Sequence, residues 1–230
     1  MARLTIEVIV CTLEDAVEAA RGGADRLEIV RDLARGGMTP SIDLVRRIQR
    51  EVPLPLRVMV RESDGFVCGS DDERLALADR AMALDALTID GIVVGWTRDG
   101  RVDEETLACI LEAAPSLRAT FHHAFDTLPD PEAALRVLQR HRQIDRVLTS
   151  AGTGTWASRC VMLERYARWT HDRIGILPGG GVDEDALRAL VGCACTTEAH
   201  VGRAARVGHK VEGRVSADAV RALCHAAGWD

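Results

Sequence analysis

Apolar and polar positions follow two alternating patterns along this chain. Short apolar runs rich in Val and Ile are each followed by a longer segment with helical periodicity. The short runs predict strands at residues 5–10, 26–30, 56–60, 91–94, 118–122, 146–148, 174–177 and 199–201. The longer segments predict helices at residues 13–21, 40–50, 71–84, 103–113, 131–139, 158–170, 183–191 and 217–227.

Start and stop signals support several of these helices. Thr12 precedes the first helix as a capping residue. The pairs Thr39-Pro40 and Asp130-Pro131 predict helices that begin with proline behind a capping side chain. Gly22-Gly23 predicts the end of the first helix.

Eight strand–helix units in 230 residues predict a (β/α)₈ TIM barrel, an α/β fold, as one domain over residues 1–230. An aspartate precedes three even-numbered strands, at Asp25, Asp90 and Asp145, as expected for a barrel built from repeated βαβα quarters. The alternative is a doubly wound open sheet, which gives the same alternation.

Composition narrows the classes of partner. The net charge of −6 argues against nucleic acid, and no apolar stretch is long enough to predict a membrane span. The N-terminal segment lacks the order of a signal peptide. Seven scattered cysteines, an odd number, predict free thiols in a reducing cytoplasm.

Ionisable residues lie in or directly after the predicted strands. In a barrel the carboxyl ends of the strands meet at one mouth, so these side chains are expected to converge there. Strand alternation turns Glu7 and Glu28 inward, with Arg61 and, below it, Arg57 to compensate their charge. The candidate acid–base residues are Glu7, Glu28, Arg61, His122, Asp126 and His200. The alternative is a buried ion network that only fills the barrel.

Two adjacent histidines need separate assignments. Neighbours on a strand face opposite ways, so only one of His122 and His123 points inward. We assign His122 to the interior and pair it with Asp126. For His123, a partly buried structural role and a functional role remain open.

A glycine run after the seventh predicted strand suggests an anion site. Gly179, Gly180 and Gly181 precede a helix, and Arg203 follows the eighth strand. Loops after strands seven and eight commonly bind phosphate in this architecture, and Ser150 in the loop after strand six adds a donor. A tight turn explains the glycines equally well.

The cysteines give weaker signals. Cys193 and Cys195 have the spacing of a soft-metal motif but precede the eighth strand, at the end opposite the mouth. We interpret them as idle thiols in a loop. Cys11 and Cys68 lie on the mouth side and are weaker metal candidates.

Several of these stretches together resemble the CutC family of copper homeostasis proteins. The motifs, in order, are IEVIVCTLEDAVEAARGGADRLEIV, LARGGMTPS, RVMVRESDG, ATFHHAFD, DRVLTSAG, ILPGGGV and the histidine of EAHVG. The resemblance implies a (β/α)₈ barrel, a cytoplasmic location, a homo-oligomer and copper as ligand.

The chain departs from the family at positions that matter for copper. The family often has cysteine where this chain has Ile9 and Val30, and Cu(I) prefers sulfur ligands. Met59 remains as a thioether. The family also often has arginine at the positions of His123 and Ser63.

Three functions remain open from the sequence. The first is copper homeostasis, and the second is an isomerase or lyase acting on an anionic small molecule. A Schiff-base enzyme is not expected, because Lys210 is the only lysine and lies beyond the last strand. The third is a ligand sensor without catalysis. Carboxylates and imidazoles also suit a divalent metal, and no nucleotide cofactor is indicated. The metal candidates are Glu7, Glu28, His122 and His200.

Overall fold

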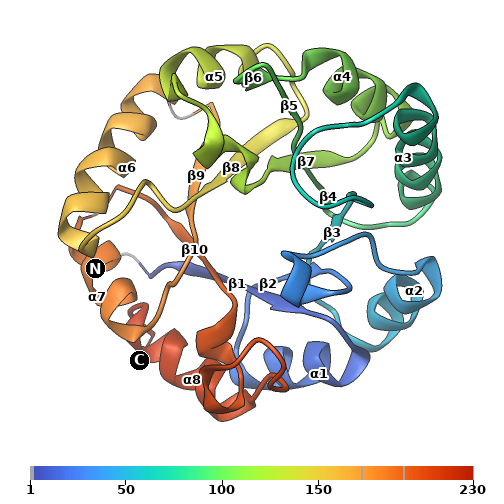
Figure 1. Ribbon diagram of the computed structural model, residues 1–230. Helices are drawn as coiled ribbons and strands as arrows, with labels where there is room; N and C mark the ends of the chain where they lie inside the picture. The colour runs from blue at the N-terminus through green and yellow to red at the C-terminus, as the bar shows by residue number, and fades with distance from the viewer. Residues whose placement is uncertain (1–2, 172, 194, 230) are drawn as a thin grey trace.

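A ring of parallel strands forms the centre of the molecule, and helices surround it (Figure 1). The computed structural model describes residues 3–171, 173–193 and 195–229. The main sheet has eight strands in the order β10-β1-β2-β3-β4-β7-β8-β9, all paired in parallel, and β9 lies beside β10 where the ring closes. The strands are β1 (Thr5–Val10), β2 (Arg26–Ile29), β3 (Leu56–Met59), β4 (Gly91–Val94), β7 (Arg118–Phe121), β8 (Ile144–Thr149), β9 (Gly175–Pro178) and β10 (Glu198–Val201).

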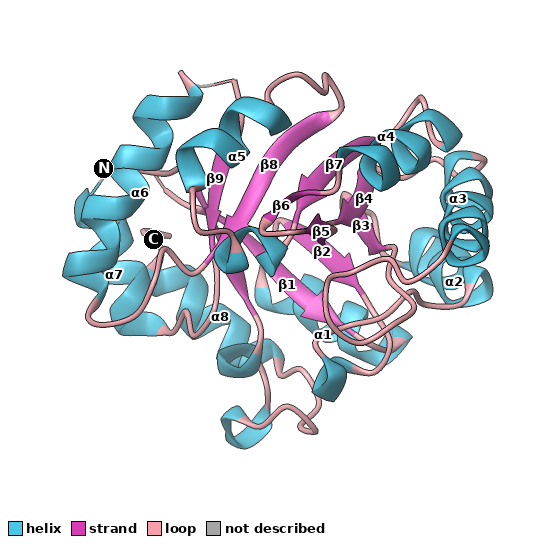
Figure 2. Cartoon of the chain, turned by 45° about the horizontal axis from the view of Figure 1, so that its top comes forward, coloured by secondary structure: helices cyan, strands magenta, loops and turns pink. Residues whose placement is uncertain are grey.

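One helix follows each strand of the ring and covers its outer face (Figure 2). The helices are α1 (Leu13–Gly22), α2 (Ile42–Glu51), α3 (Asp71–Asp85), α4 (Glu104–Ala113), α5 (Pro131–Leu138), α6 (Trp156–Thr170), α7 (Glu184–Cys193) and α8 (Ala217–Ala226). The (β/α)₈ barrel expected from the sequence is therefore confirmed, and the open doubly wound sheet is excluded.

Side-chain caps fix where the helices begin. Thr12 accepts a hydrogen bond from the Asp15 amide at the start of α1, and Asp130 accepts one from the Ala133 amide at the start of α5. The expected start of α2 at Pro40 is wrong. Ser41 caps that helix instead, and Pro40 lies outside it. Thr39 and Ser41 are both capping residue types, and Ser41 is the one that accepts the capping hydrogen bond.

Strand alternation separates two sets of buried side chains. Residues on the outer face of the ring pack against the helices and form the main hydrophobic core. Ile9, Val30, Met59 and Val93 form a separate apolar cluster on the inner face. Charged residues occupy much of the remaining interior, and they define the candidate site.

The loops at the carboxyl ends of the strands carry additional structure that the sequence did not predict. A short hairpin, β5 (Thr97–Arg98) with β6 (Arg101–Val102), follows β4. Short 3₁₀ helices follow β2, β7 and β10: η1 (Leu33–Arg35), η2 (His123–Thr127), η3 (Arg203–Ala205) and η4 (Val207–His209). All of these elements lie around the barrel mouth. Among the described residues, no helix combines the length and the apolar character needed to cross a membrane.

Candidate functional site

Two carboxylates and an imidazole meet inside the barrel, below its mouth. Glu7, Glu28 and His200 come from β1, β2 and β10, which are neighbours in the ring, and all three are buried. His200 Nδ1 lies 2.8 Å from Glu7 Oε1 and 3.3 Å from Glu28 Oε2. The buried Glu28 Oε2 atom has no hydrogen-bond partner among the described residues. Strand alternation thus brought these three residues together as expected.

The surroundings shift the pKa values of the two carboxylates in opposite directions. Burial alone raises the pKa of Glu7, but the Arg26 guanidinium and His200 outweigh burial and hold that pKa well below its usual range. Among the described residues Glu28 forms no ion pair with an arginine, and burial raises its pKa to about 7. Burial lowers the pKa of His200, but Glu28 and Glu7 reverse the effect and raise it. A proton within the trio is therefore favoured on Glu28 or His200 over Glu7.

Below the trio, the ion pairs continue in an unbroken chain. Arg26 Nε donates to Glu7 Oε2 at 2.5 Å, and Arg26 Nη2 donates to Glu198 Oε2 at 2.7 Å. Glu198 also accepts from Arg146 Nε at 2.8 Å, and Arg146 Nη1 donates to Asp145 at 2.6 Å. Arg26 is thus the counter-charge of Glu7, a role that the sequence analysis did not assign.

Arg57 completes this chain at its lower end, and its expected role beside Glu7 and Glu28 is wrong. Its guanidinium donates to Asp145 Oδ2 at 2.7 Å and to Asp90 Oδ2 at 2.6 Å. Two of the repeated aspartates therefore hold one buried arginine. The connected set is Glu28, His200, Glu7, Arg26, Glu198, Arg146, Asp145, Arg57 and Asp90. Its five carboxylates and three guanidiniums leave two negative charges when His200 is neutral.

Above the trio, an open cavity of about 720 Å³ forms the barrel mouth. His200 and Ile9 line it from below, and His123 lines its wall. The loops after β9 and β10 supply most of the remaining lining, including Gly180, Gly181, Arg203 and His209. The cavity therefore connects the carboxylate–imidazole trio to solvent.

Of the two adjacent histidines, His123 lines the cavity and His122 does not. His123 Nδ1 lies 2.8 Å from Asp126 Oδ2. Asp126 also accepts hydrogen bonds from the Thr149 hydroxyl and, at 2.9 Å, from the Ser150 amide. Burial raises the pKa of Asp126, but the hydrogen bonds from His123, Thr149 and Ser150 outweigh it and lower that pKa. The predicted partner of Asp126 was therefore wrong by one position.

His122 is buried and lies outside the described lining of the cavity. Its Nδ1 atom accepts a hydrogen bond from the Ala124 amide at 3.1 Å, and Phe66 lies over its ring with centroids 5.2 Å apart. Burial, followed by the charge of Arg61, lowers the pKa of His122 to about 3. His122 is accordingly neutral, and it does not belong to the metal-ligating group formed by the described residues.

Arg61 holds two loops together instead of facing the carboxylates. Its guanidinium donates to the backbone carbonyls of Arg35, Gly37 and Gly65 at 3.2–3.3 Å. These carbonyls belong to the segments after β2 and β3. The expected compensation of Glu7 and Glu28 by Arg61 is therefore wrong.

The glycine run lies at the cavity, as the anion prediction requires. Gly180 and Gly181 have φ of +73° and +88°, which L side chains rarely adopt, and within the described part of the chain neither amide donates a hydrogen bond. The amides of Gly179 and Ser150 are occupied, because they donate to Thr149 O and Asp126. Anion binding by this loop and the exposed Arg203 remains a prediction.

Known proteins identify the family of this chain. A family model described as the CutC family matches residues 4–205. A copper homeostasis protein cutC homolog of Homo sapiens is 34% identical over 196 residues, which cover 85% of this chain and 71% of that protein. A family protein CutC of Photobacterium profundum is 31% identical over 214 residues, which cover 91% of this chain and 86% of that protein. The chain belongs to the CutC family.

Solved structures agree with the barrel. The crystal structure of a CutC protein from Streptococcus agalactiae has a TM-score of 0.79 at 24% identity and covers 86% of this chain and 98% of that one. Phosphoribosyl anthranilate isomerase from Thermotoga maritima has a TM-score of 0.62 at 15% identity and covers 98% of both chains. At such identities these similarities concern the fold alone.

Two CutC positions are apolar in this chain and face the barrel interior. Ile9 lines the mouth cavity, and Val30 is fully buried beside Met59. No sulfur stands at either position. Cys11 packs against this apolar cluster, and its Sγ atom accepts from Arg206 at 3.6 Å. At the two positions where the resemblance implies cysteine, the chain therefore has hydrocarbon side chains in the barrel interior.

The other cysteines depart partly from expectation. Cys193 and Cys195 form a disulfide, so the prediction that they are free thiols is wrong. Cys11 and Cys68 are free, and neither belongs to a metal-ligating group among the described residues. Cys68 donates weakly to the Ser70 carbonyl at 3.4 Å. The mouth thus offers oxygen and nitrogen donors in preference to sulfur.

Proposed function

We propose that this CutC-family protein takes part in copper homeostasis by binding Cu²⁺ at Glu7, Glu28 and His200. One ligand atom of each residue lies within 4.8 Å of the others, below an open cavity. The observation that carries the proposal is the buried Glu28 Oε2 atom without a hydrogen-bond partner, beside an imidazole and a second carboxylate. A cation there gives the unpartnered carboxylate oxygen a ligand contact.

The donor set and the charge both favour a divalent ion. Cu²⁺ accepts imidazole and carboxylate ligands, whereas Cu⁺ prefers sulfur. The ion-pair chain leaves two negative charges within the barrel, which one divalent ion neutralises. Relatives named as copper homeostasis proteins support copper as the cargo.

Calorimetric titration with Cu²⁺ tests this proposal. We expect one site per chain, with affinity reduced at least about tenfold in Glu28→Gln and in His200→Asn. Glu132→Gln is the matched control, because Glu132 is an exposed carboxylate paired only with Arg136 among the described residues. Equal affinities in all four proteins would exclude the trio as the copper site.

The shape of the mouth supports a second candidate, acid–base chemistry on an anionic small molecule. A cavity of about 720 Å³ is far larger than a single ion needs. His123, which pairs with Asp126, lines one wall, and Gly180 and Gly181, whose amides have no partner within the described residues, lie in the same lining. We expect a phosphorylated or carboxylated substrate to bind with its anion at the glycines and a transferable proton at His123.

A screen of phosphorylated and carboxylated metabolites distinguishes this candidate from a pure copper protein. Turnover of a metabolite that falls at least about a hundredfold in His123→Asn would support it. Glu132→Gln again serves as the control. Ligands that stabilise the fold but are never converted would instead identify a sensor.

We further propose that the protein acts in the cytoplasm and as a homo-oligomer, since the CutC resemblance implies both. Cell fractionation tests the first statement. Light scattering of the purified chain tests the second, and a monomer at all concentrations would contradict it.

A further inference from the structure

A second group of metal-ligating atoms lies outside the carboxylate–imidazole trio. Cys160 belongs to α6, Cys193 ends α7, and Cys195 lies in the loop that leads into β10. Their three sulfur atoms lie within 4.8 Å of one another. That loop precedes β10, so Cys195 lies at the amino end of that strand, and the group shares no residue with the carboxylate–imidazole trio.

We propose that Cys160, Cys193 and Cys195 form a three-thiolate site for Cu⁺ when the Cys193–Cys195 disulfide is reduced. The disulfide uses two of the three sulfurs and leaves Cys160 as a free thiol beside them. A disulfide alone gives no reason for a third sulfur at this distance, whereas a trigonal soft cation uses all three. This inference is separate from the mouth proposal, because it uses different residues and a different oxidation state of copper.

The spacing suits a cation at the centre of the three sulfurs. Metal–sulfur bonds of about 2.3 Å in a trigonal arrangement place the sulfur atoms about 4 Å apart. The three sulfurs already lie close to that range, since none is more than 4.8 Å from another. Once the disulfide opens, side-chain rotations at Cys193 and Cys195 reach this geometry.

The reductive step balances with an external dithiol as reductant. Its thiolate attacks one sulfur of the Cys193–Cys195 bond, that bond breaks, and a mixed disulfide forms. The second thiol of the reductant then displaces the protein sulfur. The reductant leaves as a disulfide and has given two electrons, and both cysteines become thiols. Cu⁺ then replaces the thiol protons of the three cysteines, which pass to solvent.

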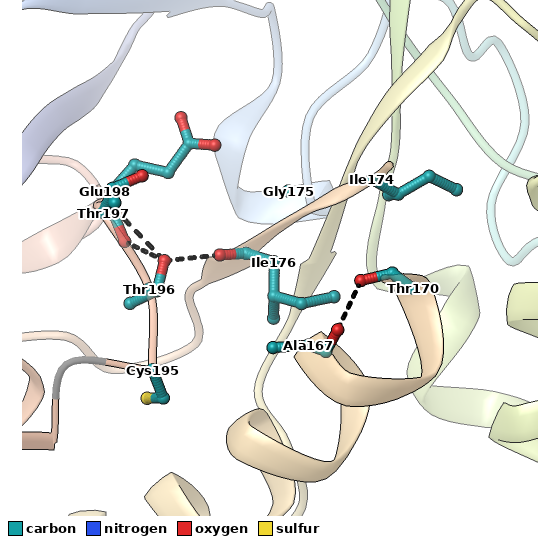
Figure 3. Close-up of a pocket in the computed structure, with 9 residues that line it drawn as sticks. All are labelled: Ala167, Thr170, Ile174, Gly175, Ile176, Cys195, Thr196, Thr197 and Glu198. Carbon is teal, nitrogen blue, oxygen red and sulfur yellow. Dashed lines mark hydrogen bonds between the residues drawn. The ribbon is translucent and has the colours of Figure 1, made fainter. Parts of the chain in front are cut away.

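Access to the group comes from the side of Cys195. Cys195 lines a cavity of about 340 Å³ together with Thr196, Glu198 and residues of α6 and β9 (Figure 3). Thr196 holds the loop in place, because its hydroxyl donates to the Ile176 carbonyl at 2.6 Å. Cys193 and Cys195 are half-buried, while Cys160 is buried. A reductant therefore reaches the disulfide before it reaches Cys160.

Three sulfurs favour Cu⁺ over Zn²⁺. Structural zinc takes four ligands in a tetrahedron. Among the described residues, the group consists of three cysteines, and it does not include the Glu164 carboxylate, whose Oε1 lies 3.8 Å from Cys193 Sγ. Soft thiolates also select Cu⁺ by their chemistry.

Competition for Cu⁺ with a bicinchoninate chelator tests the site. The protein is reduced with dithiothreitol, freed of reductant without air, and titrated with Cu⁺ in ascorbate. We expect one tightly held Cu⁺ per chain and an ultraviolet thiolate-to-copper charge-transfer band. The unreduced protein and Cys195→Ser should hold Cu⁺ at least about tenfold more weakly. Cys195 is a half-buried loop residue, so its substitution leaves the fold intact, and the melting curve of the variant checks this.

Two matched variants separate this site from the mouth. Cys109→Ser removes a half-buried free cysteine on α4 outside the group, and it should retain Cu⁺. Glu28→Gln, which should lose Cu²⁺ at the mouth, should also retain Cu⁺. Equal Cu⁺ binding in reduced wild type and Cys195→Ser would overturn the proposal. Preferential loading with Zn²⁺, or loss of Cu⁺ in Glu28→Gln, would overturn it as well.

Discussion

Arg26 balances most of the negative charge beneath the mouth. It is buried and donates to both Glu7 and Glu198. Arg26→Leu leaves both buried carboxylates without this counter-charge, and we expect a loss of about 3–5 kcal/mol in the free energy of unfolding. Urea denaturation measures the loss. Arg188→Leu breaks exposed pairs with Glu184 and Asp185 and should cost less than about 1 kcal/mol. Similar losses in both variants would show that the buried charges are not balanced by Arg26.

His122 sets a pH dependence of stability with a definite sign. Its pKa is about 3 in the folded protein, against 6.5 for an unperturbed histidine, because burial disfavours the charged ring. Between pH 6.5 and pH 3, the histidine therefore binds a proton in the unfolded chain but not in the folded chain. The free energy of unfolding falls as the pH drops through this window. Between pH 7 and pH 4.5 this amounts to roughly 2–3 kcal/mol.

His122→Asn tests that assignment. Asparagine keeps an acceptor for the Ala124 amide but does not titrate. We expect the urea midpoint of the variant to fall less than that of wild type between pH 7 and pH 4.5. Parallel curves for the two proteins would show that acid destabilisation comes from other groups.

The sequence predicted the strands and helices well, but the side chains just beyond the strand ends poorly. Alternation placed Glu7 and Glu28 inward, because both lie within strands whose other face packs on helices. His123 lies beyond β7, where the chain turns at once into the 3₁₀ helix η2. Strand parity no longer applies there, so the ring of His123 reaches the mouth. Arg61 lies two residues beyond β3, and the same limit applies to it.

The sequence also did not predict which buried arginine pairs with which buried carboxylate. Arg26 shares its strand face with Glu28, yet it binds Glu7 and Glu198 on β1 and β10. Which arginine meets which carboxylate depends on the stagger of neighbouring strands, and no local pattern records that stagger. The presence of charged residues inside the barrel was predictable, but their partners were not.

Gly91 marks a close approach between two strands of the ring. A Cβ atom there would lie 2.3 Å from the Arg118 carbonyl oxygen on β7 and 2.7 Å from Arg57 Nη1. Gly91→Ala should therefore destabilise the barrel by about 1–3 kcal/mol or more, since backbone of β7 has to move. Gly192→Ala is the control, because none of the described residues lies within 4 Å of its Cβ position on helix α7. We expect that variant to be neutral or slightly stabilised in thermal unfolding. Equal melting temperatures for the two would contradict the close packing of β4 on β7.

At the scale of the whole molecule, the barrel mouth combines a closed ring of strands with an excess of negative charge in the interior below it. The strands β10, β1 and β2 are adjacent in the ring, and they carry His200, Glu7 and Glu28. A cation bound there joins the first two strands of the chain to the last one, and it binds the folded chain alone. Binding therefore adds directly to the free energy of unfolding.

The size of this stabilisation follows from mass action. At a Cu²⁺ concentration one hundred times the dissociation constant, binding adds about 2.7 kcal/mol, which for a chain of this length raises the melting temperature by roughly 5–10 °C. Calorimetry with and without Cu²⁺ measures the shift, and a chelator should reverse it. Glu28→Gln should lose most of the shift, whereas Glu132→Gln should keep it, because only the first removes a ligand from the trio. An equal shift in both variants would mean that copper stabilises the barrel from another place, and the charge imbalance at the mouth would then have no metal to neutralise it.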